Sequence, residues 1–145
     1  MAINVFVIRL SRGRLGTRLG TQTILLLHTH GRKSGKQYTT PVNYLEIAKN
    51  GSTFLYTTSY RERVWWRNLR GGAEVTLRLQ GRDLPARAEV VEELEQVAQE
   101  LGTYLHQAPK LGRYLDVSMD EGGTPDVEDL QRAAEKMVVV KTSVV

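Results

Sequence analysis

The sequence predicts a mainly β (α+β) protein, a small antiparallel β-barrel with a short helix after its third strand and peripheral helices before its last strand. Short β-branched or alternating segments follow one another across tight turns. Strands and helices do not alternate along the chain, which argues against a doubly wound parallel sheet. With 145 residues the chain can bury a core of its own, and we take residues 1–145 as a single domain.

The first half of the chain contains three predicted strands. A short helix is expected at residues 2–11, followed by a buried, β-branched strand at 21–29. Residues 38–47 alternate, with Tyr38, Thr40, Val42 and Tyr44 on one face. The Asn50-Gly51 pair supplies the two positive-φ positions of a type I′ turn, so residues 53–59 should return as an antiparallel third strand.

The second half mixes strands and helices. Residues 61–70 predict a short helix ending at Gly71-Gly72, and two strands follow at 74–79 and 84–91. Residues 92–107 have helical spacing, with Leu94, Val97, Ala98, Leu101 and Leu105 on one face. A helical turn at 110–117, a loop at 120–125, a helix at 126–136 capped by Thr124 or Asp126, and a strand at 137–145 complete the chain.

Composition excludes several classes of protein. There is no cysteine, which removes disulfides, thiolate nucleophiles and Cys-based metal sites. The apolar runs are much shorter than the roughly 20 residues that cross a bilayer, and the N-terminus is a poor signal peptide. We therefore expect a cytoplasmic protein. A peripheral membrane contact through the apolar and basic start of the chain stays open.

Charge is distributed unevenly. Residues 1–72 contain 12 Lys or Arg against 2 acidic residues, whereas residues 73–145 contain 8 against 14. This asymmetry predicts that the first half builds a surface for an anionic partner. Nucleic acid, anionic lipid and a phosphorylated small molecule all remain candidates.

The densest basic segment is the turn at residues 31–36, Gly-Arg-Lys-Ser-Gly-Lys. It is not a P-loop, because one spacer residue is missing and Gln37 occupies the Ser/Thr position. Its glycines would still let backbone N–H groups approach an anion. The turn is either such an anion cradle or a solvated basic hairpin.

Two further groups are candidates for a site. Trp65 and Trp66 point about 100° apart on a helix, so that one enters the core while the other borders a cleft, with Asn68 on the side of Trp65. This helix of tryptophans and arginines could bind RNA by base stacking, line a cofactor groove, or simply anchor one tryptophan in the core. Tyr104 and Tyr114 either line a pocket or pack with a wet hydroxyl.

Metal and hydrolytic chemistry have weaker support. His28 and His30 share a strand face, but nearby ligands are too few, and a hydrogen-bonded pair is favoured over a metal site. No serine lies in a G-x-S-x-G elbow, so hydrolysis is not indicated.

Four segments, taken in order, resemble the deazaflavin-dependent nitroreductase and quinone reductase family. They are HTHGRKSGKQYTTPVNY (28–44), YTTS (56–59), VWWRNLRGGAEVTLRLQGR (64–82) and LPARAEVV (84–91). The resemblance covers about residues 22–91. It implies coenzyme F420 bound on a split β-barrel related to the FMN-binding barrels.

The resemblance also implies roles for individual residues. The cofactor's phosphate and acidic tail would meet Arg32, Lys33, Ser34, Gly35 and Lys36. Its ring system would lie beside Thr39, Thr40, Pro41, Thr57, Thr58 and Ser59, with Trp65 and Asn68 closing the phosphate end of the groove. Hydride would pass from the reduced deazaflavin to a small organic acceptor, foremost a quinone, and Tyr104 or solvent would supply the proton.

The chain also departs from the best-known nitroreductase branch. The link at residues 60–63 is shorter, and Tyr104 and Tyr114 are ten residues apart with an acidic segment, 116–135, before the last strand. These differences favour a quinone over a nitro compound as acceptor. The alternatives are an FMN-dependent enzyme, an F420 carrier without turnover, or a nucleic-acid-binding module. Small split barrels often pair through exposed strand edges, so a homodimer is also a candidate.

Overall fold

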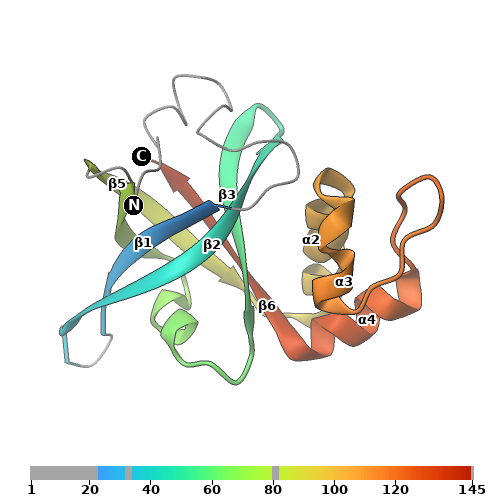
Figure 1. Cartoon of the computed structure of the whole chain (residues 1–145). Helices are drawn as coiled ribbons and strands as arrows, with labels where there is room; N and C mark the ends of the chain where they lie inside the picture. The colour runs from blue at the N-terminus through green and yellow to red at the C-terminus, as the bar shows by residue number, and fades with distance from the viewer. Residues whose placement is uncertain (1–22, 32–33, 80–81, 145) are drawn as a thin grey trace.

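The computed structural model of the chain describes residues 23–31, 34–79 and 82–144. Six antiparallel strands close into a barrel in the spatial order β1-β2-β3-β6-β5-β4 (Figure 1). The strands are β1 (Thr23–His30), β2 (Gln37–Lys49), β3 (Ser52–Tyr60), β4 (Ala73–Leu79), β5 (Arg82–Val91) and β6 (Met137–Val144). The predicted mainly β fold with an antiparallel barrel is confirmed.

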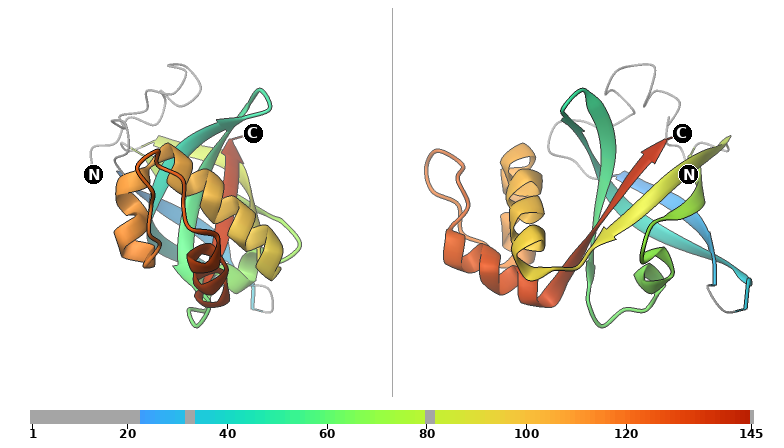
Figure 2. Two further views of the ribbon diagram at one scale, coloured as in Figure 1. Left: turned by 90° about the vertical axis from the view of Figure 1, so that its right-hand side faces the viewer. Right: turned by 180° about the vertical axis from the view of Figure 1, so that it is seen from behind.

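Helices α2 (Leu94–Gln107), α3 (Gly112–Leu115) and α4 (Val127–Lys136) lie together on one side of the barrel (Figures 1 and 2). The short 3₁₀ turn η2 (Pro109–Leu111) joins the first two. Side chains cap the longer helices: Glu93 accepts from two backbone N–H groups of α2, and Asp126 accepts from Asp129 N at 3.0 Å. Asp126 is therefore the cap of α4. Within the described part of the chain, no helix is long and apolar enough to span a membrane.

Two expectations about the elements need correction, and a third is not tested. The helix expected at residues 61–70 is a 3₁₀ helix, η1, confined to Trp65–Leu69, because Arg61 and Arg63 instead make backbone hydrogen bonds in the loop that leaves β3. Leu94, expected on the buried face of α2, is exposed because it is the first residue of the helix and precedes the residues that face the barrel. The helix expected at residues 2–11 lies outside the described residues.

The turn between β2 and β3 matches the sequence expectation. Asn50 and Gly51 have φ values of 52° and 78°, the positive angles that a type I′ turn requires. The turn fixes the register in which Lys49 faces Ser52 and Leu45 faces Tyr56.

Strands β2, β3 and β6 each contribute buried side chains to both faces of the sheet. In β2, Val42 and Tyr44 belong to the core inside the barrel, whereas Leu45 and Ile47 belong to a second core beneath the helices. The same alternation divides β3, where Leu55 points into the barrel and Tyr56 faces the helices. The helix layer is therefore packed directly on these three strands.

Strands β2 and β3 separate beyond their hairpin, and this separation positions the site. Their pairing runs only from Lys49–Ser52 to Leu45–Tyr56. The first half of β2 then pairs with β1, and the second half of β3 pairs with β6. The residues of β2 and β3 beyond this point no longer hydrogen-bond each other, which leaves room for a pocket between them.

Candidate functional site

A pocket of 880 Å³ lies where β2 and β3 separate. One wall comes from the strands and the loop after β3, and the other comes from the helix layer. The strand wall comprises Thr40, Pro41, Val42, Asn43, Thr57, Thr58, Ser59, Tyr60, Arg63 and Trp65. The helix wall comprises Tyr104, Lys110, Leu111, Arg113, Tyr114 and Leu115, with Met137 at the start of β6.

The pocket brings together many of the residues singled out from the sequence. Thr40 and Pro41 from β2, three hydroxyl residues from β3, Trp65 from η1, and both tyrosines from the helices line it. These residues come from segments up to about seventy positions apart, so only the fold makes them neighbours. Both tyrosines line the pocket, and Tyr104 also packs in the core beneath the helices.

The two tryptophans occupy different environments, as expected. Trp66 is 3% exposed and donates from Nε1 to the carbonyl of Tyr60 at 3.2 Å, while the guanidinium of Arg70 lies 5.1 Å from its ring centre. Trp65 borders the pocket and donates from Nε1 to Ser59 Oγ at 3.1 Å. Trp66 anchors η1 in the core, and Trp65 and Ser59 form one corner of the pocket.

Tyr104 is the most buried polar group of the helix wall. Its side chain is 2% exposed, and burial raises the pKa of its phenol to about 12 against the opposing effect of a hydrogen bond with the Thr58 side chain. The phenol therefore keeps its proton at neutral pH. Tyr114, by contrast, is 71% exposed and lies at the mouth of the pocket.

The charged residues around the pocket are all basic among the described residues that line it. They are Arg63 from the loop after β3, and Lys110 and Arg113 from η2 and α3. Sequence reasoning missed this group as part of a site. A signal was present, because positions 110, 113 and 114 have the i, i+3, i+4 spacing that places side chains on one face of a helical segment.

The basic turn lies outside this pocket. Ser34, Gly35 and Lys36 are exposed, and the turn is closed by hydrogen bonds from Gly31 N to Lys36 O at 2.7 Å and from Gly35 N to Gly31 O at 2.9 Å. It connects two strands, which agrees with the argument against a P-loop. Arg32 and Lys33 lie outside the described residues.

Two further sequence candidates are not among the residues that line the pocket. Thr39 faces outward, where its hydroxyl contacts His28 Nδ1 at 2.8 Å, and Asn68 lies on η1 away from the cavity. The bond made by His28 is thus to a threonine of the neighbouring strand and not to His30. Among the described residues, no group of three or more His, Cys, Asp or Glu is arranged to hold a metal ion.

The sequence model of the F420H2-dependent quinone reductase family matches residues 1–118. This is more than half of the chain, and the chain therefore belongs to that family. It is an F420-dependent reductase, and its cofactor is coenzyme F420.

Three solved structures that match the chain share little sequence identity with it. They include a domain-swapped dimer, with 18% identity, 81% of this chain and 78% of that chain covered and a TM-score of 0.42. An F420-H2 dependent reductase has 18% identity, 81% and 92% coverage and a TM-score of 0.42. A protein of unknown function from Agrobacterium tumefaciens has 17% identity and a TM-score of 0.48; the alignment covers 86% of this chain and 51% of that one. A comparison with curated proteins found no match.

Proposed function

We propose that the pocket between β2, β3 and the helix layer is where the chain brings F420 and a quinone-type acceptor together. One observation supports this most directly. Five of the six residues that the family resemblance assigns to the cofactor ring lie on one wall (Thr39 is the exception), and the two tyrosines that the sequence singles out as candidate pocket residues lie on the other. The two reactants would then meet face to face between strands and helices, as hydride transfer requires.

The chemistry of the strand wall fits the cofactor. Thr57 and Ser59 are 6% and 8% exposed and line the cavity, and the Ser59 hydroxyl is held by Trp65 Nε1 and the Tyr60 carbonyl. Polar groups placed in this way suit the polar edge of a flat ring. The described lining contains cations and no carboxylate, which suits an anionic ligand. A cofactor ring on this wall would therefore be held by hydroxyl groups in a positive field.

The basic turn fits the other end of the same cofactor. Lys36 immediately precedes β2 and lies four positions before Thr40, a distance of about 13 Å if the chain is extended. A ring beside Thr40 and Pro41 would therefore extend its phosphate and acidic tail toward the turn. In this arrangement the turn holds the tail and stays outside the reaction pocket.

Bound reduced F420 supplies the hydride, and the chain supplies orientation, charge and a proton. Negative charge develops on the acceptor oxygen as the hydride arrives, and the cations of the pocket stabilise it. Tyr104 holds its phenolic proton at neutral pH and is within the pocket, so it is the proposed donor to that oxygen.

The helix wall favours a flat acceptor with a polar edge. Leu111 and Leu115 supply apolar surface, while Lys110 and Arg113 lie beside them. A quinone offers a planar apolar ring with carbonyl oxygens at opposite edges, which matches this combination. We therefore propose quinones ahead of nitro compounds as acceptors.

The test is a side-by-side titration of the purified chain with F420 and with FMN, followed by turnover of reduced F420 with a soluble quinone. We expect quenching of deazaflavin fluorescence at micromolar protein, no competition by an oligonucleotide, and quinone-dependent oxidation. Lys36→Ala should weaken the quenching, whereas Arg78→Ala, on the distant β4–β5 hairpin, should not. Absence of F420 binding, or binding without quinone turnover, would contradict the proposal.

A homodimer is a separate proposal. Among the described residues, three pairs join β1 to β4, so much of the described edge of β1 has no β4 partner there. A second copy would cover this edge by strand pairing. Light scattering after size exclusion tests it, and a monomer at high micromolar concentration would contradict it.

A further inference from the structure

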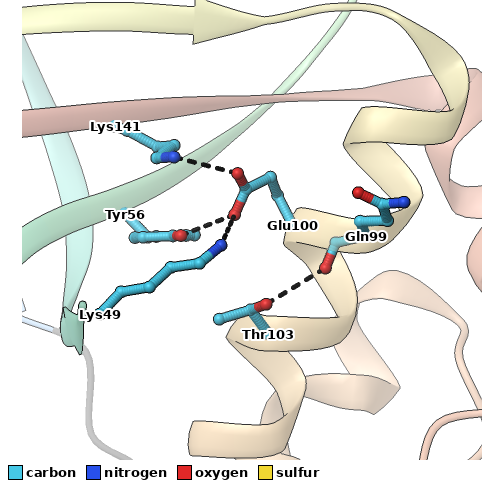
Figure 3. Close-up of polar contacts among 6 residues, drawn as sticks. All are labelled: Lys49, Tyr56, Gln99, Glu100, Thr103 and Lys141. Atoms are coloured by element: carbon cyan, nitrogen blue, oxygen red, sulfur yellow. Dashed lines mark hydrogen bonds and ion pairs between the residues drawn. The ribbon is translucent and has the colours of Figure 1, made fainter.

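The carboxylate of Glu100, on helix α2, links the helix to the barrel. Glu100 accepts hydrogen bonds from the Tyr56 hydroxyl at 2.6 Å and from Lys141 Nζ at 3.0 Å, and Lys49 Nζ lies 3.8 Å away (Figure 3). Its three partners come from three different strands, β3, β6 and β2. The Glu100 side chain is 13% exposed and Tyr56 is fully buried, whereas Lys49 is 41% exposed, so the group lies between helix and strands with Lys49 at its solvent edge.

The electrostatics of the group keep Glu100 charged. Burial by itself would raise the pKa of Glu100, but the hydrogen bonds from Tyr56 and Lys141 and the charges of Lys141 and Lys49 outweigh it and hold the pKa below its usual value. Burial and the bond to Glu100 raise the pKa of Tyr56, so its hydroxyl stays a donor. The contacts are therefore charge-assisted and geometrically demanding.

Glu100 on α2 and its partner Tyr56 on β3 each lie one repeat of their element away from a residue that lines the pocket. Tyr104 follows Glu100 by one helical turn, about 6 Å along α2 and on the same face. Thr58 follows Tyr56 by two strand positions, about 6.6 Å along β3 and also on the same face. Thr58 and Tyr104 are hydrogen-bonded to each other, so the same helix and strand are joined at two successive levels.

Only the second of these levels lines the pocket. The first is more tightly held, because its carboxylate meets two direct donors within 3.0 Å. A slide or rotation of α2 that displaced Tyr104 from Thr58 would also disturb the contacts of Glu100, one turn away on the same helix.

We infer that Glu100 is a positioning residue of the acceptor pocket, which fixes the Tyr104 hydroxyl by holding α2 against β3 through Tyr56 and Lys141. The inference rests on the proposed function of Tyr104. It assigns no contact with F420 or acceptor to Glu100 itself. Its effect on the reaction should therefore pass entirely through Tyr104.

A double-mutant cycle tests this dependence. Glu100→Gln keeps the shape of the side chain but removes its charge, and we expect kcat with a soluble quinone to fall about tenfold while the Kd for F420 changes less than twofold. In a Tyr104→Phe background the same substitution should cost less than twofold. An equal loss in both backgrounds would mean that Glu100 merely stabilises the fold, and would overturn the inference.

Two further variants and one measurement without turnover complete the design. Tyr56→Phe should reproduce the kinetic effect of Glu100→Gln if the latter folds poorly, whereas Lys49→Met, which removes the longest and most exposed contact, should leave kcat within twofold. In the chain without cofactor, Glu100→Gln should shift the ring NMR signals of Tyr104, and unchanged signals would contradict the inference. A wild-type chain that fails to bind F420 or reduce quinone would instead refute the proposed function.

Discussion

At the scale of single residues, Tyr104 combines burial with a position in the pocket wall. Tyr104→Phe removes only the hydroxyl, so the packing of a side chain that is 2% exposed is preserved. We expect kcat for quinone reduction to fall at least tenfold, because a positioned proton donor is lost, while F420 affinity is unchanged. Steady-state kinetics and fluorescence titration separate the two quantities.

The same residue predicts a feature of the pH profile. The pKa of Tyr104 is raised to about 12, so the phenol stays protonated throughout the range from pH 6 to pH 9. No loss of kcat attributable to Tyr104 ionisation should occur there. A decline in wild-type kcat near pH 8 that disappears in Tyr104→Phe would contradict this assignment.

Glu46 on β2 predicts a pH dependence of stability. Burial raises the pKa of its carboxyl from 4.5 to about 7, and its Oε1 has no hydrogen-bond partner among the described residues. The folded chain therefore binds this proton more tightly than the unfolded chain, and the free energy of unfolding falls as pH rises from about 4.5 to about 7.

Glu46→Gln should remove that loss. Because the side chain is only half-buried, solvent screening reduces the effect to about 1 kcal/mol at pH 8, or a rise in Tm of about 3 °C, with little change at pH 4.5. Thermal unfolding at both pH values measures it. Glu74→Gln, at an exposed position on β4, is the control, and an equal gain in both variants would contradict the prediction.

At the scale of elements, η1 separates a structural tryptophan from a binding one. Trp66→Phe should cost about 1–2 kcal/mol of unfolding free energy, because it leaves core space and removes the hydrogen bond from the indole N–H to the Tyr60 carbonyl, which keeps its other donors. Trp65→Phe should cost less than about 0.5 kcal/mol but should weaken F420 binding several-fold. Chemical denaturation and F420 titration on both variants check the division, and the reverse pattern would refute it.

Local patterns in the sequence predicted the elements well. The Asn50-Gly51 pair, the alternation that buries Val42 and Tyr44, and the Asp126 cap each depend on near neighbours in the chain. They were readable because such signals are set by local backbone geometry. The 3₁₀ form of η1 could not be predicted from the sequence, because it depends on hydrogen bonds from the preceding loop to β3 and on the burial of Trp66.

The site was predictable only in part, because it depends on contacts between segments that are far apart in the chain. Thr40, Thr58 and Trp65 came from the family resemblance, but their meeting with Tyr104 depends on where β2 leaves β3 and how α2 lies on the barrel. Lys110 and Arg113 had no recognisable motif, since a cation is informative only when its cavity is known. The link between Glu100 and Tyr56 spans 44 positions and left no trace in local spacing.

At the scale of the whole molecule, the uneven charge predicts how salt affects cofactor binding. Residues 1–72 carry 12 basic against 2 acidic residues, and one of the 12, Arg63, forms a basic rim of the pocket together with Lys110 and Arg113 from the second half. These cations are exposed, so their attraction for an anionic ligand is screened once the Debye length falls from about 10 Å at 0.1 M salt to about 3 Å at 1 M.

We therefore expect the Kd for F420 to rise about tenfold between 0.1 M and 1 M salt, because the phosphate and acidic tail account for most of the charge on the ligand. The same deazaflavin without phosphate and tail should bind more weakly but change less than twofold over that range. Lys36→Ala should flatten the dependence for F420, whereas Arg78→Ala, whose guanidinium is paired with Asp83 on the far hairpin, should not. Equal salt dependence for the two deazaflavins would mean that the basic half of the chain serves some other anion, and the turn at residues 31–36 would then have no part in holding the cofactor.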